Sequence, residues 1–154
     1  MTGGRLLRVA KYLSGGDDTF LVTYGDGLSD VNITSVLEFH RSHGKLATMT
    51  TVRPSSRYGV LEVGERGQVL HFAEKPVLDG WVNVGFFAFN RRVLDYIAGD
   101  QTPLESAPLE SLARAGELMA YRHEGFFHAM DTYREYKFLN DLWASGHAPR
   151  KVWR

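Results

Sequence analysis

The segment Thr23-Tyr24-Gly25-Asp26-Gly27 constrains the fold of this chain more than any other feature. It follows the apolar run Phe20-Leu21-Val22, which predicts a buried strand ending at Tyr24. Glycines on both sides of Asp26 let the backbone turn sharply and approach a ligand closely, and ligands of open α/β sheets bind where strands end. A carboxylate at such a turn can hold a divalent cation that in turn holds phosphates. The alternative is an ordinary turn, because Gly-Asp-Gly is favourable turn chemistry in any protein.

The residues around this segment predict an α/β fold. Residues 33–43 carry apolar side chains at helical spacing, with Asn32 as the expected N-cap and Gly44 just beyond the last turn. Residues 46–52 are rich in Thr and Val and predict another strand. A strand, a helix and a strand of these lengths predict a βαβ unit whose strands are parallel. Ahead of this unit we expect a helix over residues 4–13 and a turn at Ser14–Asp18.

The second half of the chain carries more strand patterns than the first. The turn Gly64-Glu65-Arg66-Gly67 between two short strand patterns predicts a hairpin. The final helix has the clearest start, because Thr132 and Glu135 form a capping box. The expected elements are strands at 60–63, 69–72, 81–89 and 118–122, short helices at 91–97 and 108–115, and the final helix at 132–145.

Composition excludes several classes of function. The 154 residues suffice for one domain with a real core. Since 18 basic residues balance 18 acidic ones, no electrostatic argument favours nucleic acid or a membrane as a partner. The absence of cysteine excludes disulfides, zinc-thiolate sites and thiol catalysis, and it fits a cytoplasmic location. No apolar run approaches the length of a membrane span.

Two carboxylates far apart in the sequence could converge on one cation. Asp131 directly precedes the capping box of the final helix, and a helix N-terminus favours bound anions and their counterions. Mg²⁺ commonly uses one or two carboxylates together with substrate phosphates, so Asp26 and Asp131 would suffice. The alternative for Asp131 is an additional capping charge for the helix.

Other polar residues stand at strand ends or within strands. Lys75, in Glu74-Lys75-Pro76, could hold a phosphate as a point charge, although a surface Glu-Lys pair is the alternative. Asn83 and Gly85 share one face of the strand at 81–89, where an amide could bind a sugar hydroxyl. A strand that crosses another backbone closely would equally require a glycine at position 85. The segment Arg57-Tyr58-Gly59 follows a Pro-Ser-Ser loop that could close over a ligand or simply connect two strands.

Histidine offers only a weak metal-binding pattern. His40 and His43 are three residues apart on the expected helix, a spacing that suits a pair of ligands. No third ligand stands nearby in the sequence, so the pair favours a structural role. No Gly-x-Ser-x-Gly segment points to a serine nucleophile.

Taken in order, these segments resemble the sugar-phosphate nucleotidyltransferases, and within them the glucose-1-phosphate cytidylyltransferase branch. The similarity runs along essentially the whole chain. It rests on an ordered set of segments: Thr2-Gly3-Gly4-Arg5-Leu6, Thr23-Tyr24-Gly25-Asp26-Gly27, Ser29-Asp30-Val31, Phe39-His40-x-x-His43-Gly44-Lys45, Arg57-Tyr58-Gly59, Glu74-Lys75-Pro76, Asn83-x-Gly85-Phe86-Phe87 and Met130-Asp131-Thr132.

The resemblance implies a Rossmann-like α/β fold with a mixed sheet. It also implies an Mg²⁺-dependent transfer of a cytidylyl group from CTP to glucose 1-phosphate, giving CDP-glucose and pyrophosphate, which we expect to be incomplete in this chain alone. It implies a cytoplasmic enzyme of polysaccharide sugar supply that assembles into homo-oligomers at full length. By the same resemblance, Asp26 and Asp131 would hold the metal, and Lys75 would hold the sugar phosphate. The residues implied to contact substrate are Arg5 near the nucleotide, and Tyr58, Glu74, Asn83 and Gly85 around the sugar.

The chain also departs from the pattern of that family. Its members open with a strand, a Gly-Gly-x-Gly-Thr-Arg loop and a Pro-Lys-Pro segment, and this chain has neither that loop nor that segment. We therefore expect an N-terminally truncated fold that corresponds to the C-terminal portion of the domain, with an exposed sheet edge at its first strand. Smaller departures are His128-Ala129 in place of a Gln-Pro pair and Val84 in place of a second glycine.

This alignment divides the chain into three parts and leaves other functions open. Residues 1–52 would complete a nucleotide-binding βαβ region, residues 53–131 would bind the sugar phosphate, and residues 132–154 would form the final helix and tail. The alternatives to a cytidylyltransferase are a non-catalytic module that binds sugar phosphate, and a nucleotidyltransferase that uses another nucleotide.

Overall fold

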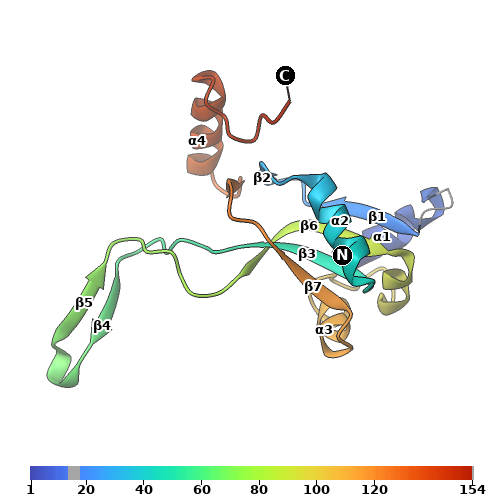
Figure 1. The fold of residues 1–154 in the computed structure, drawn as a ribbon, viewed down its shortest axis with the longest axis horizontal. Helices are drawn as coiled ribbons and strands as arrows, with labels where there is room; N and C mark the ends of the chain where they lie inside the picture. Colours follow the sequence, from blue (N-terminus) through green and yellow to red (C-terminus); the bar gives the residue numbers. More distant parts are fainter. Residues whose placement is uncertain (14–17, 154) are drawn as a thin grey trace.

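The computed structural model describes residues 1–13 and 18–153 as a mixed α/β fold (Figure 1). Most of the turn expected at Ser14–Asp18 lies outside the described residues. The strands are β1 (Thr19–Thr23), β2 (Gly27–Ser29), β3 (Ala47–Val52), β4 (Val60–Val63), β5 (Val69–Ala73), β6 (Val82–Asn90), β7 (Leu118–Arg122) and β8 (Phe127–Ala129). The helices are α1 (Thr2–Val9), α2 (Ile33–His43), α3 (Ala107–Arg114) and α4 (Tyr133–Ala144), with shorter 3₁₀ turns η1 (Ala10–Tyr12), η2 (Glu65–Gly67) and η3 (Arg91–Tyr96).

A four-stranded mixed sheet in the order β1-β6-β3-β7 forms the centre of the molecule. Strand β6 is antiparallel to both of its neighbours, whereas β3 and β7 are parallel. The strands of the expected βαβ unit, β1 and β3, therefore run in the same direction, as predicted. They are not neighbours in the sheet, because β6 lies between them and forms hydrogen bonds with both. β6 belongs to the part of the chain expected to bind sugar phosphate, so that part shares its sheet with residues 1–52.

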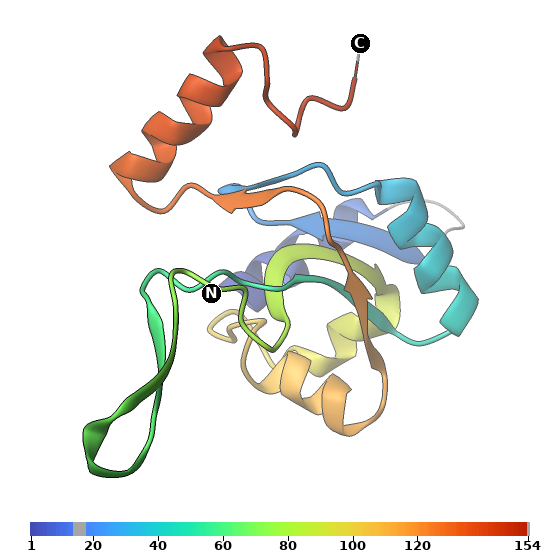
Figure 2. The same cartoon turned by 60° about the vertical axis from the view of Figure 1, so that its left-hand side comes forward.

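Each face of this sheet is covered by its own set of helices (Figure 2). On one face, α1, η3 and α3 contribute to a large core around Phe87 and Phe89, which Phe20 and Val22 of β1 join. On the other face, α2 places Val36 against Ala88 of β6. Because successive side chains of a strand point to opposite faces, β6 supplies both cores at once.

Helix α2 and helix α4 form as their sequences predict. The side chain of Asn32 accepts a hydrogen bond from the backbone N–H of Ser35, and Gly44 ends α2 with φ of 65°. Thr132 and Glu135 form the reciprocal capping box at the start of α4. Helix α4 buries its apolar side chains only in part, since Leu139 is 2% exposed and Phe138 is 44% exposed. No described helix is long and apolar enough to cross a membrane.

Two smaller sheets lie outside the central one. Strands β4 and β5 form the expected hairpin, which projects from the body as an arm (Figures 1 and 2). Strands β2 and β8 form a short antiparallel ribbon that the sequence patterns did not predict. Three-residue strands are too short to show an alternating pattern, and their pairing joins segments about a hundred positions apart in the chain. This ribbon leads directly into α4 and positions the candidate site.

Candidate functional site

The β2–β8 ribbon brings Asp26 and Asp131 to the same end of the molecule. Gly27 pairs with Ala129 in the ribbon, and just beyond that pair the backbone N–H of Met130 donates to the carbonyl of Asp26 at 2.9 Å. Asp26 therefore precedes one strand and Asp131 follows the other, and both residues are exposed. Within residues 1–13 and 18–153, no group of three or more His, Cys, Asp and Glu side chains forms a metal cage. A pair of carboxylates with open coordination positions still fits Mg²⁺, which takes its other ligands from phosphates and water.

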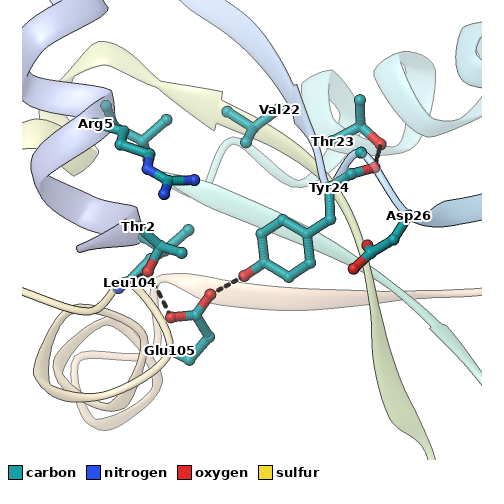
Figure 3. Close-up of a pocket in the computed structure, with 10 residues that line it drawn as sticks. Thr2, Arg5, Val22, Thr23, Tyr24, Asp26, Leu104 and Glu105 are labelled. Carbon is teal, nitrogen blue, oxygen red and sulfur yellow. Dashed lines mark hydrogen bonds between the residues drawn. The ribbon is translucent and has the colours of Figure 1, made fainter. Parts of the chain in front are cut away.

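Asp26 also lines a cavity of about 390 Å³ between α1 and the end of β1 (Figure 3). Arg5 of α1 lines the same cavity, and its guanidinium extends into it. The ring of Tyr24 occupies the middle of this view, and its hydroxyl donates to Glu105. The hydroxyl of Thr2 donates to the other oxygen of Glu105 at 2.7 Å. This network fixes the aromatic ring that directly precedes the Gly25-Asp26-Gly27 turn.

The network changes the acidity of its two titratable groups. Burial, and then the hydrogen bond and charge of Glu105, raise the pKa of Tyr24 far above its ordinary value, so the phenol stays protonated and can donate. Burial acts to raise the pKa of Glu105 as well, but the two hydroxyl donors outweigh it and leave this pKa below its ordinary value. The hydrogen bonds of the cluster thus stabilise a neutral phenol beside a charged carboxylate.

Gly85 has a structural reason to be glycine. Its φ is 79°, and a Cβ atom there would lie 2.5 Å from the ring of Tyr24. The N–H of Tyr24 donates to the carbonyl of Gly85 at 3.0 Å, while the side chain of Asn83 accepts the N–H of Gly85 at 2.9 Å. The close approach at Gly85 is therefore made by the side chain of Tyr24 and not, as the alternative had it, by another backbone. The sugar contacts of Asn83 and Gly85 stay predictions.

Lys75 lines a second cleft of about 550 Å³ beside the N-terminus of α4. The other residues that line this cleft are Arg57, His128, Thr132, Arg134, Glu135 and Phe138. Arg57, Lys75 and Arg134 in this lining are basic and Glu135 is acidic, so the cleft carries an excess of positive charge that suits an anion. Lys75 itself has φ of 47°, an uncommon left-handed conformation for a side chain of this kind.

Glu135 connects this cleft to Asp131. One oxygen of its carboxylate accepts the backbone N–H groups of Asp131 and Thr132 at 3.0 and 2.9 Å. The other oxygen pairs with Arg57 at 3.4 Å. Desolvation acts to raise the pKa of Glu135, but the bonds from Thr132 and Asp131 and the charge of Arg57 hold it below its ordinary value. Glu135 therefore stays ionised and fixes the backbone of Asp131.

Tyr58 and Glu74 lie at the base of the hairpin arm, next to Lys75. Glu74 pairs with Lys75 at 3.7 Å, and its carboxylate lies close to Gly59, the neighbour of Tyr58. The side chain of Tyr58 is 78% exposed. Neither residue lines the cavity beside Asp26 or the cleft beside Lys75. Their sugar-binding roles stay predictions.

The histidine pair on α2 is structural. The N–H of Lys45 donates to Nδ1 of His43 at 2.9 Å, so Nε2 of His43 carries the proton and donates to Oγ1 of Thr48 at 2.8 Å. The Thr48 hydroxyl then donates to Nδ1 of His40 at 2.9 Å. Burial lowers the pKa of both histidines, helped at His40 by His43 and at His43 by Lys45. Both rings are therefore held neutral by a directed chain of hydrogen bonds inside the fold.

Some of the residues that line the cavity or the cleft belong to no sequence pattern that predicts a functional role. Glu105 stands 81 positions from Tyr24, and nothing local to it indicates a contact with that ring. Arg134 and His128 lie next to recognisable segments, but their direction toward Lys75 depends on how β8 meets α4. By contrast, the Thr132-x-x-Glu135 spacing already marked Glu135 as a group that binds backbone N–H.

Comparison with known proteins supports the same family. The family model for nucleotidyl transferases matches residues 5–132. Glucose-1-phosphate cytidylyltransferase of Salmonella typhi is 49% identical over 99% of this chain, which covers 59% of that protein. A Bacillus subtilis protein named as a probable glucose-1-phosphate cytidylyltransferase is 42% identical over the same shares of the two chains. This chain therefore spans about three-fifths of the length of these relatives.

Solved structures agree on the fold. The crystal structure of HddC from Yersinia pseudotuberculosis superposes with a TM-score of 0.68 at 19% identity, and the match covers 92% of this chain and 62% of that one. HddC complexed with GMP-PN superposes with a TM-score of 0.65. The family model covers most of the sequence and the solved structures share its architecture. The chain therefore belongs to the nucleotidyl transferase family.

Proposed function

We propose that this chain serves the transfer of a cytidylyl group from CTP to glucose 1-phosphate, giving CDP-glucose and pyrophosphate. The observation that carries the proposal is the 49% identity with a glucose-1-phosphate cytidylyltransferase across 99% of the chain. The geometry of the site is compatible with it, because two carboxylates and a basic cleft flank the same β2–β8 ribbon.

In this reaction an oxygen of the sugar phosphate attacks the α-phosphorus of CTP. The bond between the α-phosphorus and the bridging oxygen breaks, and pyrophosphate leaves with that electron pair. Little covalent chemistry falls to the protein, so its residues act by positioning and by neutralising charge. Mg²⁺, when bound, would supply positive charge to the phosphates, and Asp26 and Asp131 would hold it.

Each remaining residue has a proposed part. Lys75 would hold the phosphate of glucose 1-phosphate as a point charge in the basic cleft. Arg5 would face the nucleotide from the cavity that it shares with Asp26. The proposed sugar contacts are Tyr58, Glu74, Asn83 and Gly85. We further propose that the protein acts in the cytoplasm, as its lack of cysteine suggests.

Isothermal titration calorimetry with glucose 1-phosphate and with CTP, each with Mg²⁺, tests the proposal. Replacing Lys75 with Met is expected to weaken glucose 1-phosphate binding at least about tenfold, because a hydrogen bond to a charged group contributes about 1.5–3 kcal/mol. Lys151→Met in the exposed tail serves as the matched control and should leave the affinity unchanged. Equal affinities for wild type and Lys75→Met would refute the assigned role of Lys75.

A second candidate is a module that binds sugar phosphate without catalysing transfer. The cleft around Lys75 supports it, because Lys75, Arg57 and Arg134 would supply positive charge to a sugar phosphate without a nucleotide. An assay of pyrophosphate release with CTP, glucose 1-phosphate and Mg²⁺ separates the two candidates, since a binding module would bind the sugar phosphate but release no pyrophosphate. Parallel titrations with GTP and UTP test the alternative of another nucleotide.

A further inference from the structure

His123 stands between the central sheet and the β2–β8 ribbon. It directly follows β7, and its backbone N–H donates to the carbonyl of Thr51 in β3 at 2.8 Å. Only three residues then separate it from the start of β8. Figure 2 shows the chain passing from β7 to the ribbon and on to α4. The contacts of His123 therefore influence how the ribbon leaves the sheet.

The side chain of His123 reaches the segment that follows β2. Its Nε2 lies 2.8 Å from Oδ1 of Asp30 and 3.3 Å from the carbonyl oxygen of Phe126. A carboxylate and a carbonyl both accept, so Nε2 carries the proton and donates, mainly to Asp30 because that oxygen is closer. Asp30 directly follows β2, and Phe126 directly precedes β8. This one N–H therefore joins both strands of the ribbon to the end of β7.

Further contacts hold the same end of the ribbon. The backbone N–H of Asp30 donates to the carbonyl of Phe126 at 3.2 Å, and the hydroxyl of Ser29 donates to that carbonyl at 2.8 Å. Val31, the next residue, is 7% exposed and packs in the core that α2 covers. This end of the ribbon is therefore held against the body of the fold.

The glycine at position 125 allows Asp30 and His123 to approach each other. A Cβ atom at Gly125 would lie 2.5 Å from Oδ1 of Asp30 and 2.7 Å from Cε1 of His123. The side chains of His123 and Asp30 are only 12% and 30% exposed. Because the imidazole is so little exposed, removal of the Asp30 carboxylate would leave its N–H without the better of its two acceptors.

The opposite end of the ribbon carries the candidate metal site. Gly27 pairs with Ala129 there, and Asp26 and Asp131 lie just beyond that pair. The ribbon consists of three residue pairs, and so short a two-stranded sheet is not stable by itself. Metal ligands bind tightly only when the groups behind them hold them in place. The two aspartates can therefore share a cation only while the ribbon is formed.

We propose that Asp30 and His123 are positioning residues, whose hydrogen bond keeps the β2–β8 ribbon formed and thereby holds Asp26 and Asp131 at one cation. The metal part of this inference rests on the proposed function, whereas the ribbon part does not. Asp30 is four residues from Asp26 along an extended strand, or about 13 Å. The pair thus acts through the backbone of the ribbon and not as a metal ligand.

Amide hydrogen exchange measured by NMR tests the proposal without any ligand. The N–H of Met130, which donates to Asp26, reports on the far end of the ribbon. In Asp30→Ala it is expected to exchange at least about tenfold faster than in the wild type, because a hydrogen bond to a charged group is lost. The N–H of Ala47, which donates to the carbonyl of Glu117, is the internal reference and should keep its rate. Asp95→Ala, at an exposed carboxylate on η3, is the matched control and should change neither rate.

Further variants test whether the two side chains act as a pair. His123→Ala should accelerate the exchange of Met130 as Asp30→Ala does. Combining the two changes should add little, because the same bond is broken only once. Gly125→Ala keeps both side chains but sets a methyl group against them, so it should act in the same direction. Additive effects of Asp30→Ala and His123→Ala would contradict a shared bond.

Mn²⁺ titration followed by electron paramagnetic resonance, with glucose 1-phosphate and CTP present, tests the consequence for the metal site. Asp30→Ala is expected to weaken Mn²⁺ binding about tenfold, the lower end of the loss seen when a group behind a metal ligand is removed. Asp30→Asn keeps an oxygen acceptor for His123 and should retain most of the affinity. If Asp30 attracted the cation by its charge, Asp30→Asn would instead fail as Asp30→Ala does.

Several results would overturn the proposal. Met130 exchange in Asp30→Ala that equals the wild-type rate would show that the ribbon does not depend on this bond. Equal acceleration at Met130 and Ala47 would show a general loss of stability without positioning. Unchanged Mn²⁺ affinity in Asp30→Ala, or equal losses in Asp30→Ala and Asp30→Asn, would exclude the role at the metal site. If wild-type protein binds no Mn²⁺ beyond that held by its substrates, yet Met130 responds to Asp30→Ala, the proposed metal centre fails and the control of the ribbon by the pair is supported.

Discussion

Replacing Gly85 with Ala tests whether Tyr24 and the turn that follows it depend on close packing against β6. Gly85 has φ of 79°, and its missing Cβ position lies 2.5 Å from Cδ2 and 3.1 Å from Cβ of Tyr24. Real Cβ atoms do not approach other atoms so closely, so the aromatic ring would have to move. Since Tyr24 directly precedes Gly25 and Asp26, its displacement would reach the candidate metal site.

The expected cost has two parts. A left-handed conformation costs a residue with a side chain about 1–2 kcal/mol. Forcing an extra methyl group into a filled site costs about 1–3 kcal/mol more. We therefore expect Gly85→Ala to lower the free energy of unfolding by about 2–5 kcal/mol. Gly116 provides a matched control, because its φ is 68° but no atom lies within 4 Å of its Cβ position. Gly116→Ala should carry the first part of the cost alone.

Urea unfolding followed by circular dichroism measures both variants under the same conditions. The difference between them, about 1–3 kcal/mol, isolates the contact with Tyr24. In a Tyr24→Ala background most of this difference should disappear, because the ring atoms at 2.5 and 2.8 Å are removed and only Cβ at 3.1 Å remains. Equal destabilisation by Gly85→Ala and Gly116→Ala in the wild-type background would refute this account of Gly85.

Two further predictions concern stability. Since burial lowers the pKa of His40 and His43 in the folded state, the unfolded chain binds more protons as the pH falls below the ordinary histidine value of about 6.5. The free energy of unfolding should therefore be highest above that pH and decline below it. Urea unfolding at pH 7.5, 6.5 and 5.5 measures this change. A profile identical to that of the His40→Gln/His43→Gln variant would contradict this origin. Thr132→Ala removes a side-chain cap of α4 and should cost about 1 kcal/mol, with faster amide hydrogen exchange confined to the first turn of that helix. Unchanged exchange there would show that the cap contributes nothing.

Local signals in the sequence predicted the elements whose ends depend on their own residues. Asn32 and Gly44 bound α2 because an amide acceptor and a left-handed glycine satisfy its two ends locally. The capping box of α4 likewise involves residues three positions apart. The hairpin of β4 and β5 followed from a glycine-rich turn between two strand patterns. In these places no distant partner decides the outcome.

Features that depend on distant pairing could not be predicted in the same way. β6 separates β1 from β3 because its hydrogen bonds to both strands override the simple βαβ arrangement. Glu105 reaches Tyr24 only after α1 and the segment before α3 have packed together. The β2–β8 ribbon was missed, although it is the feature that brings the neighbourhood of Asp26 beside that of Asp131. The family resemblance predicted a role for both aspartates without this geometry, because a sequence motif indicates what a residue does but not which residues lie beside it.

The most direct test of the account is whether Asp26 and Asp131 share one cation. Mn²⁺ replaces Mg²⁺ at carboxylate sites and can be counted by electron paramagnetic resonance during a titration in the presence of glucose 1-phosphate and CTP. We predict one Mn²⁺ site per chain in addition to the Mn²⁺ that the substrates bind by themselves. This site should be lost in Asp26→Asn and equally in Asp131→Asn. It should be retained in Asp95→Asn, a control at an exposed carboxylate on η3. Retention of that site in either of the first two variants would contradict a shared metal centre.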